Sequence, residues 1–196
     1  MRRPLVLLLL LCTALLVGSR FYPRVRYVDV AGAAHYTAAE LAALAGLKPG
    51  QPLLWVSTWS LAGLTRDPWV ESARVVRRWP ERVLLEVTER TPAFRYGERV
   101  YALDGTVLPG ADPLAAPVTL TGWGASRLEE ATELLRLLAD FQPEVLSYSP
   151  SGFTVFFADS TLYTPDVASL RAHWSGFVEH RGFSVAVYPW GVSVQP

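Results

Sequence analysis

Residues 68–92 read PWVESARVVRRWPERVLLEVTERTP, and this stretch decides the fold of the first half of the chain. Residues 70–79 and 82–88 are rich in Val and Leu and are separated by a Pro-Glu pair, which predicts two strands joined by a turn. Apolar side chains alternate along the second strand, so one of its faces carries Val83, Leu85 and Val87. We expect this face to pack against helices.

Upstream of these strands the sequence predicts a third strand and two helices. Residues 25–30 alternate as a strand, and a capping box that starts at Thr37 begins a helix that should bury Leu41 and Leu44. A second short helix is expected over residues 57–64. The order is β-α-α-β-β, which is typical of three strands covered on one side by two helices.

This module spans residues 24–91, and we expect its tryptophans to be core residues. Trp69 in particular should be buried between the second helix and the sheet, because Pro68 ends the preceding segment and Val70 starts a strand. The tryptophans expected in this core are Trp55, Trp59, Trp69 and Trp79.

The distal half, residues 92–196, is predicted to be α+β, with a mostly antiparallel sheet and two helices. Asp104-Gly105 is typical of the turn of a hairpin over residues 101–108. Apolar residues at helical spacing predict helices over residues 126–141 and 165–182. The other expected strands are residues 118–121, 144–149, 153–158, 161–164, 184–188 and 191–195.

The N-terminus carries an apolar stretch over residues 5–17, preceded by Arg2 and Arg3 and followed by Arg20. As a helix it would span roughly 24 Å, a little less than the roughly 30 Å hydrocarbon core of a bilayer. Two interpretations remain open on these residues. A signal anchor over residues 1–20 would keep the helix, whereas a signal peptide would be cleaved near Ser19. Both place the remaining residues outside the cytoplasm.

Composition excludes several classes of protein. The chain has 196 residues, of which 51% are hydrophobic, so a disordered protein is excluded. Its one cysteine, Cys12, excludes a disulfide scaffold. The net charge of zero hides a division of charge: residues 20–100 carry twelve basic and eight acidic side chains, whereas residues 101–196 carry four and ten. Two modules with different surroundings are therefore indicated.

Motifs for catalysis, phosphate binding or metal binding are absent from the sequence. His173 and His180 are seven residues apart, about 10.5 Å along a helix, which is too far for one shared metal ion. We therefore predict no catalytic, cofactor-binding or metal-binding residues and no cofactor. Nucleic acid is not an expected partner, because the chain is neutral overall. An enzyme built on the acidic distal half would need converging titratable groups, for which no motif is present.

The first half resembles the POTRA domain of the FtsQ/DivIB bacterial cell-division proteins. The resemblance lies in VDVAG at residues 28–32, PWV at 68–70, ARVVRRWP at 73–80 and ERTPA at 89–93. A short cytoplasmic start and an apolar helix precede this module, and residues 92–196 would then be the FtsQ-type β domain. The resemblance implies a non-catalytic, single-pass protein of the cytoplasmic membrane at the division septum. Its implied partners are FtsB/DivIC-like and FtsL-like division proteins and the septal peptidoglycan synthase complex. An unrelated secreted or anchored binding protein is the alternative.

The last expected strand is the first candidate binding site. A strand at the end of the chain has an open edge unless charge or proline guards it, and no charged residue follows Arg181. The resemblance implies that the matching segment receives a strand of the FtsB/DivIC-like partner. We therefore expect Ser193→Pro to weaken partner binding more than Val194→Ala. The predicted partner-binding residues are Tyr188, Trp190, Gly191, Val192, Ser193 and Val194.

A second candidate docking face consists of Arg74, Arg78 and Arg82, which gather around one strand and its turn. Two interpretations of this face remain open. The arginines form a solvated sheet face paired with Glu71 and Glu86, or they bind an acidic partner or anionic lipid head groups.

Overall fold

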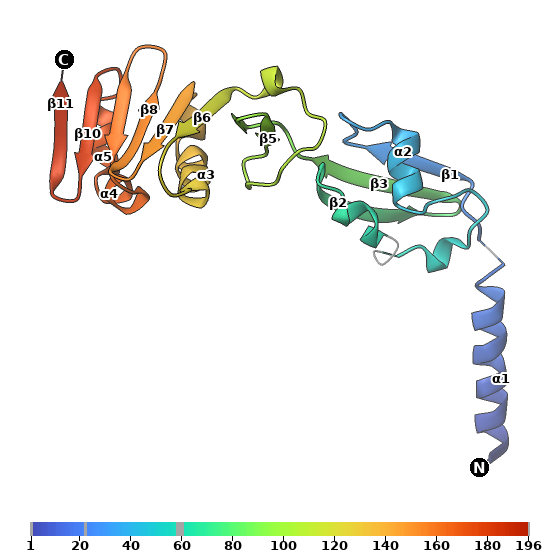
Figure 1. Ribbon diagram of the computed structural model, residues 1–196. Coiled ribbons are helices and arrows are strands. Elements are labelled where there is room, and N and C mark those ends of the chain that lie inside the picture. Colours follow the sequence, from blue (N-terminus) through green and yellow to red (C-terminus); the bar gives the residue numbers. More distant parts are fainter. Residues whose placement is uncertain (1, 22, 58–60, 196) are drawn as a thin grey trace. The chain divides into compact units, whose positions relative to one another are not determined.

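The computed structural model describes residues 2–21, 23–57 and 61–195 of the chain (Figure 1). It divides into two compact units, Met1–Arg90 and Thr91–Pro196. Each unit has its own hydrophobic core and its own sheet.

The first helix, α1, spans Arg2–Gly18, and its side chains from Val6 to Val17 are exposed. Ser19 ends it with a backbone hydrogen bond to the Leu15 carbonyl. Within the described ranges, no helix combines the length and the apolar character that crossing a membrane requires. The sequence-based prediction of a membrane helix is therefore not confirmed by the structure.

The first unit contains a three-stranded sheet in the order β1-β3-β2, with β1 at Tyr27–Ala31, β2 at Val70–Arg78 and β3 at Arg82–Glu89. The strand β1 runs parallel to β3, and β2 is antiparallel to it. The predicted alternation along β3 is confirmed, because Val83, Leu85 and Val87 are all buried. Helix α2, at Ala38–Leu44, packs on the same core (Figure 1).

The predicted capping box at the start of α2 is confirmed. The Thr37 hydroxyl accepts a hydrogen bond from the Glu40 N–H, and the Glu40 carboxylate accepts one from the Thr37 N–H at 2.8 Å. The Thr37 hydroxyl also donates to the Glu40 carboxylate at 2.7 Å, and this bond, together with the one from the Thr37 N–H, lowers the pKa of Glu40. The predicted burial of Leu44 is wrong: this side chain is 40% exposed, because the helix has only seven residues and Ala45 and Leu47 fill the core after its end.

Replacing the capping residue should weaken the first unit measurably. We expect Thr37→Ala to lower the free energy of unfolding by about 1 kcal/mol, because the Glu40 N–H in the first turn loses its acceptor, the Thr37 hydroxyl. Urea unfolding of the two proteins followed by circular dichroism measures the difference. Thr37→Ser keeps the hydroxyl and is the matched control. Equal losses in the two variants would contradict a capping role.

The predicted second helix is not an α-helix in its described part. Two short turns of 3₁₀-helix, η1 at Leu53–Trp55 and η3 at Leu64–Arg66, lie on either side of residues 58–60. These three residues, which include the expected core residue Trp59, lie outside the described residues. Pro49, Gly50 and Pro52 keep the preceding segment from forming regular turns.

The tryptophans of the first unit differ in burial. Trp69 is 7% exposed, which confirms its predicted burial, but its ring stacks on His35, at 3.6 Å between centroids, in the loop before α2. The prediction that Trp55 and Trp79 are core residues is wrong, since they are 46% and 63% exposed. Trp79 follows the last residue of β2, where the chain turns away from the core, and the Trp55 indole donates to the Ser19 hydroxyl at 3.2 Å.

The second unit contains an eight-stranded sheet in the order β11-β10-β9-β8-β7-β6-β4-β5. In chain order these strands are β4 (Phe94–Tyr96), β5 (Arg99–Tyr101), β6 (Val118–Gly122), β7 (Val145–Ser149), β8 (Gly152–Phe156), β9 (Thr161–Thr164), β10 (Ser184–Tyr188) and β11 (Gly191–Gln195). Four of the seven neighbouring pairs are antiparallel, so the expectation of a mostly antiparallel sheet is confirmed by a narrow majority. Three neighbouring pairs, β4 with β6, β6 with β7 and β9 with β10, are parallel, because crossover segments connect them.

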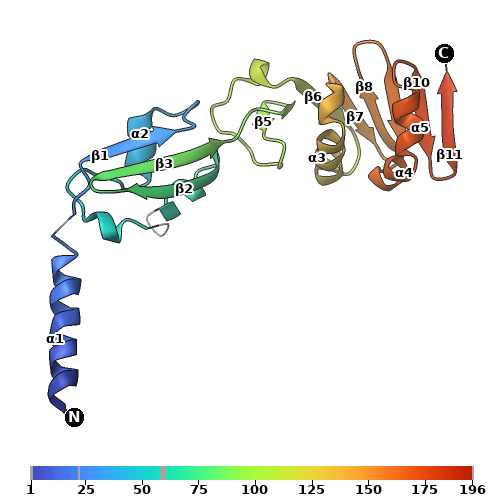
Figure 2. The same cartoon turned by 180° about the vertical axis from the view of Figure 1, so that it is seen from behind.

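The helices of the second unit are shorter than expected. Helix α3 spans Leu128–Leu137 and continues as a 3₁₀ turn, η5, at Ala139–Phe141, and a break at His173 divides the expected second helix into α4 (Val167–Ala172) and α5 (Trp174–Glu179). Helices α4 and α5 lie behind the strands in Figure 1 and in front of them in Figure 2, so they cover one face of the sheet.

The predicted turn at Asp104-Gly105 is confirmed, with Gly105 at φ +86° and the Asp104 carboxylate accepting from the Thr106 N–H. Only one bridge, between Tyr101 and Val107, forms across the expected hairpin. The regular hairpin precedes it instead, between β4 and β5, where sequence inspection did not predict strands. Its three-residue strands are too short to show an alternating pattern. A last 3₁₀ turn, η4, spans Pro113–Ala115.

Candidate functional site

The edges of the two sheets differ in how they are protected from pairing with another strand. At one end of the larger sheet, the segment that follows β5 in the chain covers that strand, because the Leu108 N–H donates to the Val100 carbonyl at 2.9 Å. In the smaller sheet the edge strand β2 has a register irregularity near Ser72 and carries exposed Arg and Glu side chains. Bulges, charge and covering segments all discourage a further strand from adding to an edge.

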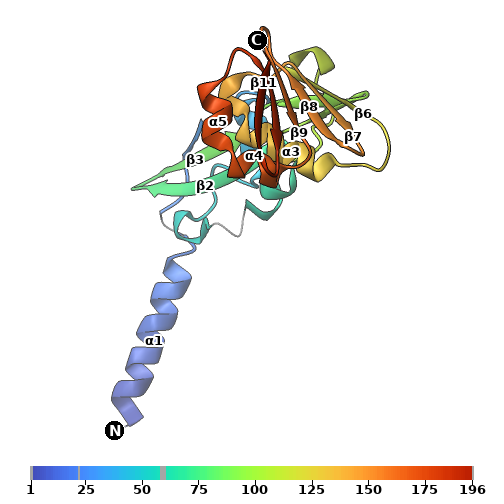
Figure 3. The same ribbon diagram turned by 90° about the vertical axis from the view of Figure 1, so that its left-hand side faces the viewer.

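Strand β11 has none of these protections. Among the described residues it pairs only with β10 and forms the other edge of the larger sheet, which faces the viewer in Figure 3. Residues 182–196 contain no charged side chain. The sequence-based prediction that the last strand is an edge is therefore confirmed by the topology.

The register of β10 and β11 determines which backbone groups face outward. Tyr188 is opposite Gly191 across a loop of only two residues, Pro189 and Trp190. Because a two-residue loop is a β-turn closed by a hydrogen bond between its first and fourth residues, Tyr188 and Gly191 form the mutually hydrogen-bonded type of pair. The two types of pair alternate along an antiparallel ladder, so Ser193 also bonds β10. The N–H and C=O groups of Val192 and Val194 therefore point away from β10, into the open edge.

Side chains of β11 hold this edge in place. Val192 and Val194 are half-buried on the helix-covered face, opposite the buried Val187 and Val185. Val192 packs against α5 so closely that a Cβ on Gly176 would lie 3.0 Å from the Val192 Cγ2 atom. The edge is thus supported by a helix and does not depend on a partner for its shape.

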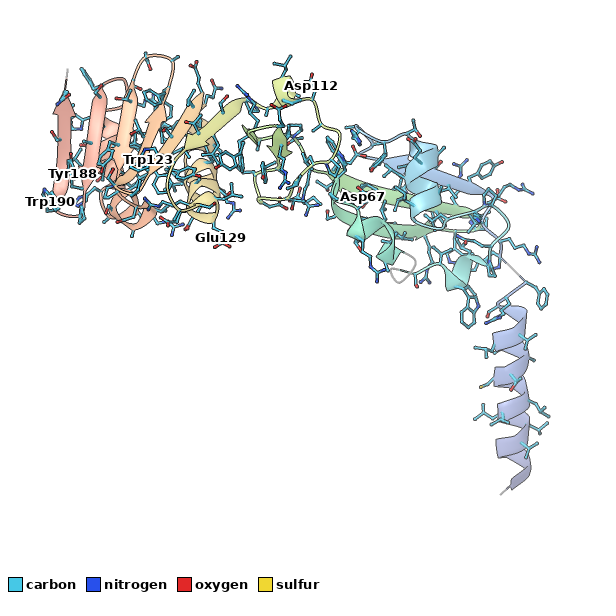
Figure 4. The ribbon with its side chains drawn as sticks, viewed as in Figure 1. Asp67, Asp112, Trp123, Glu129, Tyr188 and Trp190 are labelled. Atoms are coloured by element: carbon cyan, nitrogen blue, oxygen red, sulfur yellow. The ribbon has the colours of Figure 1, made fainter. Side chains whose placement is uncertain are left out.

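Aromatic side chains mark the turn end of this hairpin. Tyr188 stacks on Trp190, with 5.1 Å between ring centroids, and also contacts Tyr163. Trp190 is 80% exposed, and Figure 4 shows both labelled side chains at this end of the sheet. The Pro189 carbonyl lies 3.3 Å from His173 Nε2, which ties the turn to the helical layer. The six predicted partner-binding residues therefore lie together.

The structure does not bring Arg74, Arg78 and Arg82 together as free charges. The Arg74 guanidinium donates to Glu86, with Nε 2.8 Å from the carboxylate, and Arg82 forms an ion pair with Asp29 at 3.2 Å. Arg78 is exposed and has no ion pair within the described part of the chain. The pairing of Arg74 with Glu86 agrees with the solvated-face interpretation.

The histidines are engaged in structural contacts. His35 stacks on Trp69. His180 directly follows α5, and its Nδ1 atom lies 2.8 Å from the carbonyl oxygen of Gly176 in that helix. Two of the three acidic side chains of α3 are also paired, Glu130 with Arg127 and Glu133 with Arg171. In the part of the chain that the structure describes, no three His, Cys, Asp or Glu residues are grouped so that they could hold a metal ion.

The fold and the order of the elements in the first unit define a POTRA-type module followed by a separate sheet unit. Residues 24–90 match the family described as "POTRA domain, FtsQ-type". The resemblance of the chain to the FtsQ/DivIB family is thereby confirmed, and residues 24–90 form a module that is similar to FtsQ-type POTRA domains.

Curated relatives agree with this assignment. The chain is 29% identical over 129 residues to a cell division protein FtsQ of Zymomonas mobilis, covering 62% of this chain and 41% of that protein. It is 39% identical over 90 residues to FtsQ of Streptomyces collinus, covering 45% of this chain and 34% of the relative. For FtsQ of Streptomyces venezuelae the identity is 35% over 106 residues, or 52% and 39% of the two chains. The matches thus span less than half the length of these relatives.

Proposed function

We propose that this protein is a non-catalytic scaffold of the bacterial cell-division machinery. One observation carries the proposal: an FtsQ-type POTRA domain is followed by a sheet unit, residues 92–196, whose edge strand β11 is open and uncharged. Relatives that match the chain are named cell division proteins. In this proposal the unit is the FtsQ-type β domain, and it links FtsB/DivIC-like and FtsL-like proteins to septal peptidoglycan synthesis.

The mechanism is recruitment by strand addition. An extended segment of the FtsB/DivIC-like partner lies beside β11 and exchanges hydrogen bonds with the outward backbone groups of Val192 and Val194. Affinity comes from the backbone, and Tyr188 and Trp190 supply apolar contact area beside the turn. No bond is made or broken, so the protein acts by bringing its partners together.

The proposal includes attachment to the cytoplasmic membrane through residues 1–20, with the two units on the outer side and the protein at the division septum. The exposed apolar side chains of α1 and the absence of acidic residues from it support this attachment. Arg20 follows the helix and stacks over Trp55, with the guanidinium carbon 4.8 Å from the ring centroid.

Retention of the N-terminal helix is the first expected result. The protein should be recovered whole from the membrane fraction and should resist extraction by high salt and alkali, because no good cleavage site follows residue 17. Mass spectrometry of the purified protein measures its N-terminus. Mature protein that starts at Arg20 in membrane-free fractions would instead support the alternative, a secreted binding protein unrelated to division.

Co-purification tests the scaffold role directly. The tagged full-length protein is isolated from its own cell membranes in mild detergent, and the proteins that remain bound are identified by mass spectrometry. We expect an FtsB/DivIC-like and an FtsL-like protein among them. Their absence, under conditions in which these two proteins are themselves recovered from the same membranes, would contradict the proposal.

A further inference from the structure

Three chain segments meet at the end of the first unit where the chain arrives from α1. The Arg26 N–H donates to the Glu81 carbonyl at 2.7 Å, which joins the start of β1 to the β2–β3 turn. The Leu53 N–H donates to the Pro23 carbonyl at 2.9 Å, which adds η1 to the same end. Arg77 Nε donates to the Val56 carbonyl and holds the segment after η1 against β2. Figure 1 shows these elements converging at one end of the small sheet.

The side chains exposed at this end include large apolar groups. Trp79 lies at the β2–β3 turn, Leu54 and Trp55 belong to η1, and all three are exposed although the same unit buries Trp69. Phe21, at the end of the first described range, is 63% exposed. With Arg24 and Arg26 it lines a hollow of about 420 Å³ that also reaches the turn. Exposed apolar groups concentrated at one end of a domain indicate an interaction surface.

The charges at this end are mainly positive. Arg24, Arg26 and Arg78 are exposed here, and the one ion pair among them joins Arg26 to Glu81 at 3.4 Å. The two remaining guanidinium groups have no carboxylate partner in the described residues. Tryptophan combined with arginine is typical of surfaces at the boundary between water and lipid, because the indole is amphipathic and the cation attracts lipid phosphate.

We propose that this basal face, formed by Arg24, Arg26, Leu54, Trp55, Arg78 and Trp79, binds the anionic phospholipid head groups of the membrane surface. The inference rests on the membrane attachment proposed above and adds a second, lipid-specific contact outside the helix. Continuity with α1 favours lipid as the occupant. Arg24 follows Gly18 by six residues, so even an extended chain keeps it within about 20 Å of the end of the helix. The positive charge complements anionic lipid.

This contact would orient the POTRA domain. Indole rings and arginines held at the head groups restrict which face of the domain points away from the membrane. The face of the first unit opposite the basal face is then the one that points away from the membrane.

Tryptophan quenching by brominated lipid tests the inference on the full-length chain, because α1 contains no tryptophan. The protein is reconstituted into phosphatidylcholine vesicles with or without phosphatidylglycerol, and with or without bromine on the acyl chains near the head groups. The test variant is Trp55→Phe with Trp79→Phe. The matched control is Trp123→Phe with Trp190→Phe, which removes two exposed tryptophans of the other unit. Flotation of each protein with the vesicles measures attachment independently.

We expect the parent and the control to be quenched in phosphatidylglycerol vesicles and the test variant to lose most of that quenching. Replacing Arg24, Arg26 and Arg78 by Gln should reduce quenching while flotation persists. Raising the salt concentration to about 0.5 M should reduce quenching in the parent as well. If the parent floats but is not quenched, or if the control loses as much quenching as the test variant, the basal face does not contact lipid. Either result leaves the proposed membrane attachment through residues 1–20 unaffected. If the parent does not float, attachment and the inference both fail. Quenching unaffected by phosphatidylglycerol would overturn the anionic-lipid assignment.

Discussion

Replacing Trp69 by Ala is expected to lower the free energy of unfolding of the first unit by about 3–5 kcal/mol, because it deletes a large buried ring and leaves a cavity. The ring stacks on His35, whose loop is held by the Glu89 carboxylate, the acceptor for the Ala34 N–H at 2.8 Å and the Tyr36 N–H at 3.2 Å. A loop fixed in this way cannot collapse to fill the space. Since small domains are stable by only about 5–15 kcal/mol, the loss would be a large share of the total.

Urea unfolding of the full-length protein measures this effect, with Trp79→Ala as the matched control. Trp79 belongs to the same unit but is 63% exposed, and surface substitutions usually change stability by less than about 0.5 kcal/mol. Near-equal stability of Trp69→Ala and the parent would mean that the Trp69 ring contributes little packing energy in solution.

The second large effect is expected at β11. Val194→Pro should weaken binding of an FtsB/DivIC-like partner at least tenfold, equivalent to about 1.4 kcal/mol, because it removes an outward N–H that an added strand needs. Proline is tolerated on an edge strand where its nitrogen faces solvent, so pairing with β10 should survive. Val194→Ala keeps the N–H and is the matched control. Affinity is measured by titration with the purified partner, and thermal unfolding verifies that the hairpin is retained.

Ser193→Pro should behave differently from what the sequence alone suggests. The register places the Ser193 N–H against β10, opposite Ala186, so proline there removes a bond of the sheet itself. We expect this variant to lose thermal stability, and any loss of binding then follows from damage to the hairpin. Unchanged stability of Ser193→Pro together with a loss of stability in Val194→Pro would show that the assigned alternation of the ladder is reversed.

Docking through the arginine face is the competing mechanism. Charge reversal of Arg74 and Arg78 to Glu should leave partner binding nearly unchanged if β11 is the site. Binding through these arginines would instead fall steeply as salt rises from about 0.05 to 0.15 M, since exposed charges are screened over a Debye length of about 8 Å at the higher concentration. A Val194→Pro protein that binds like the parent, beside a charge-reversed protein that does not bind, would overturn the strand-addition proposal.

Local chemistry determined most of the secondary structure, and the sequence shows it directly. The capping box at Thr37, the alternation of Val83, Leu85 and Val87, and the Asp-Gly turn at residue 104 act through neighbours within four residues or through a two-residue period. Each is confirmed in the structure. The motifs around residues 68–80 and 89–93 also sufficed to indicate the family, since they lie within the module that matches it.

Only the tertiary structure decided which groups are available for binding. A period of two residues shows which side chains share a face of β11, but the direction of each N–H depends on the register with β10 and the length of the intervening loop. Burial is likewise a property of the folded chain. Trp69 and Trp79 both flank β2, yet His35 covers the Trp69 ring whereas the Trp79 ring is exposed to solvent. In the larger sheet, the strands of each parallel pair are joined by a crossover segment. The residues of these short strands do not by themselves indicate in which direction a strand runs. The sequence alone determined most of the elements and the resemblance to the FtsQ-type POTRA family, whereas contacts between distant segments determined the free edge and the exposed basal face.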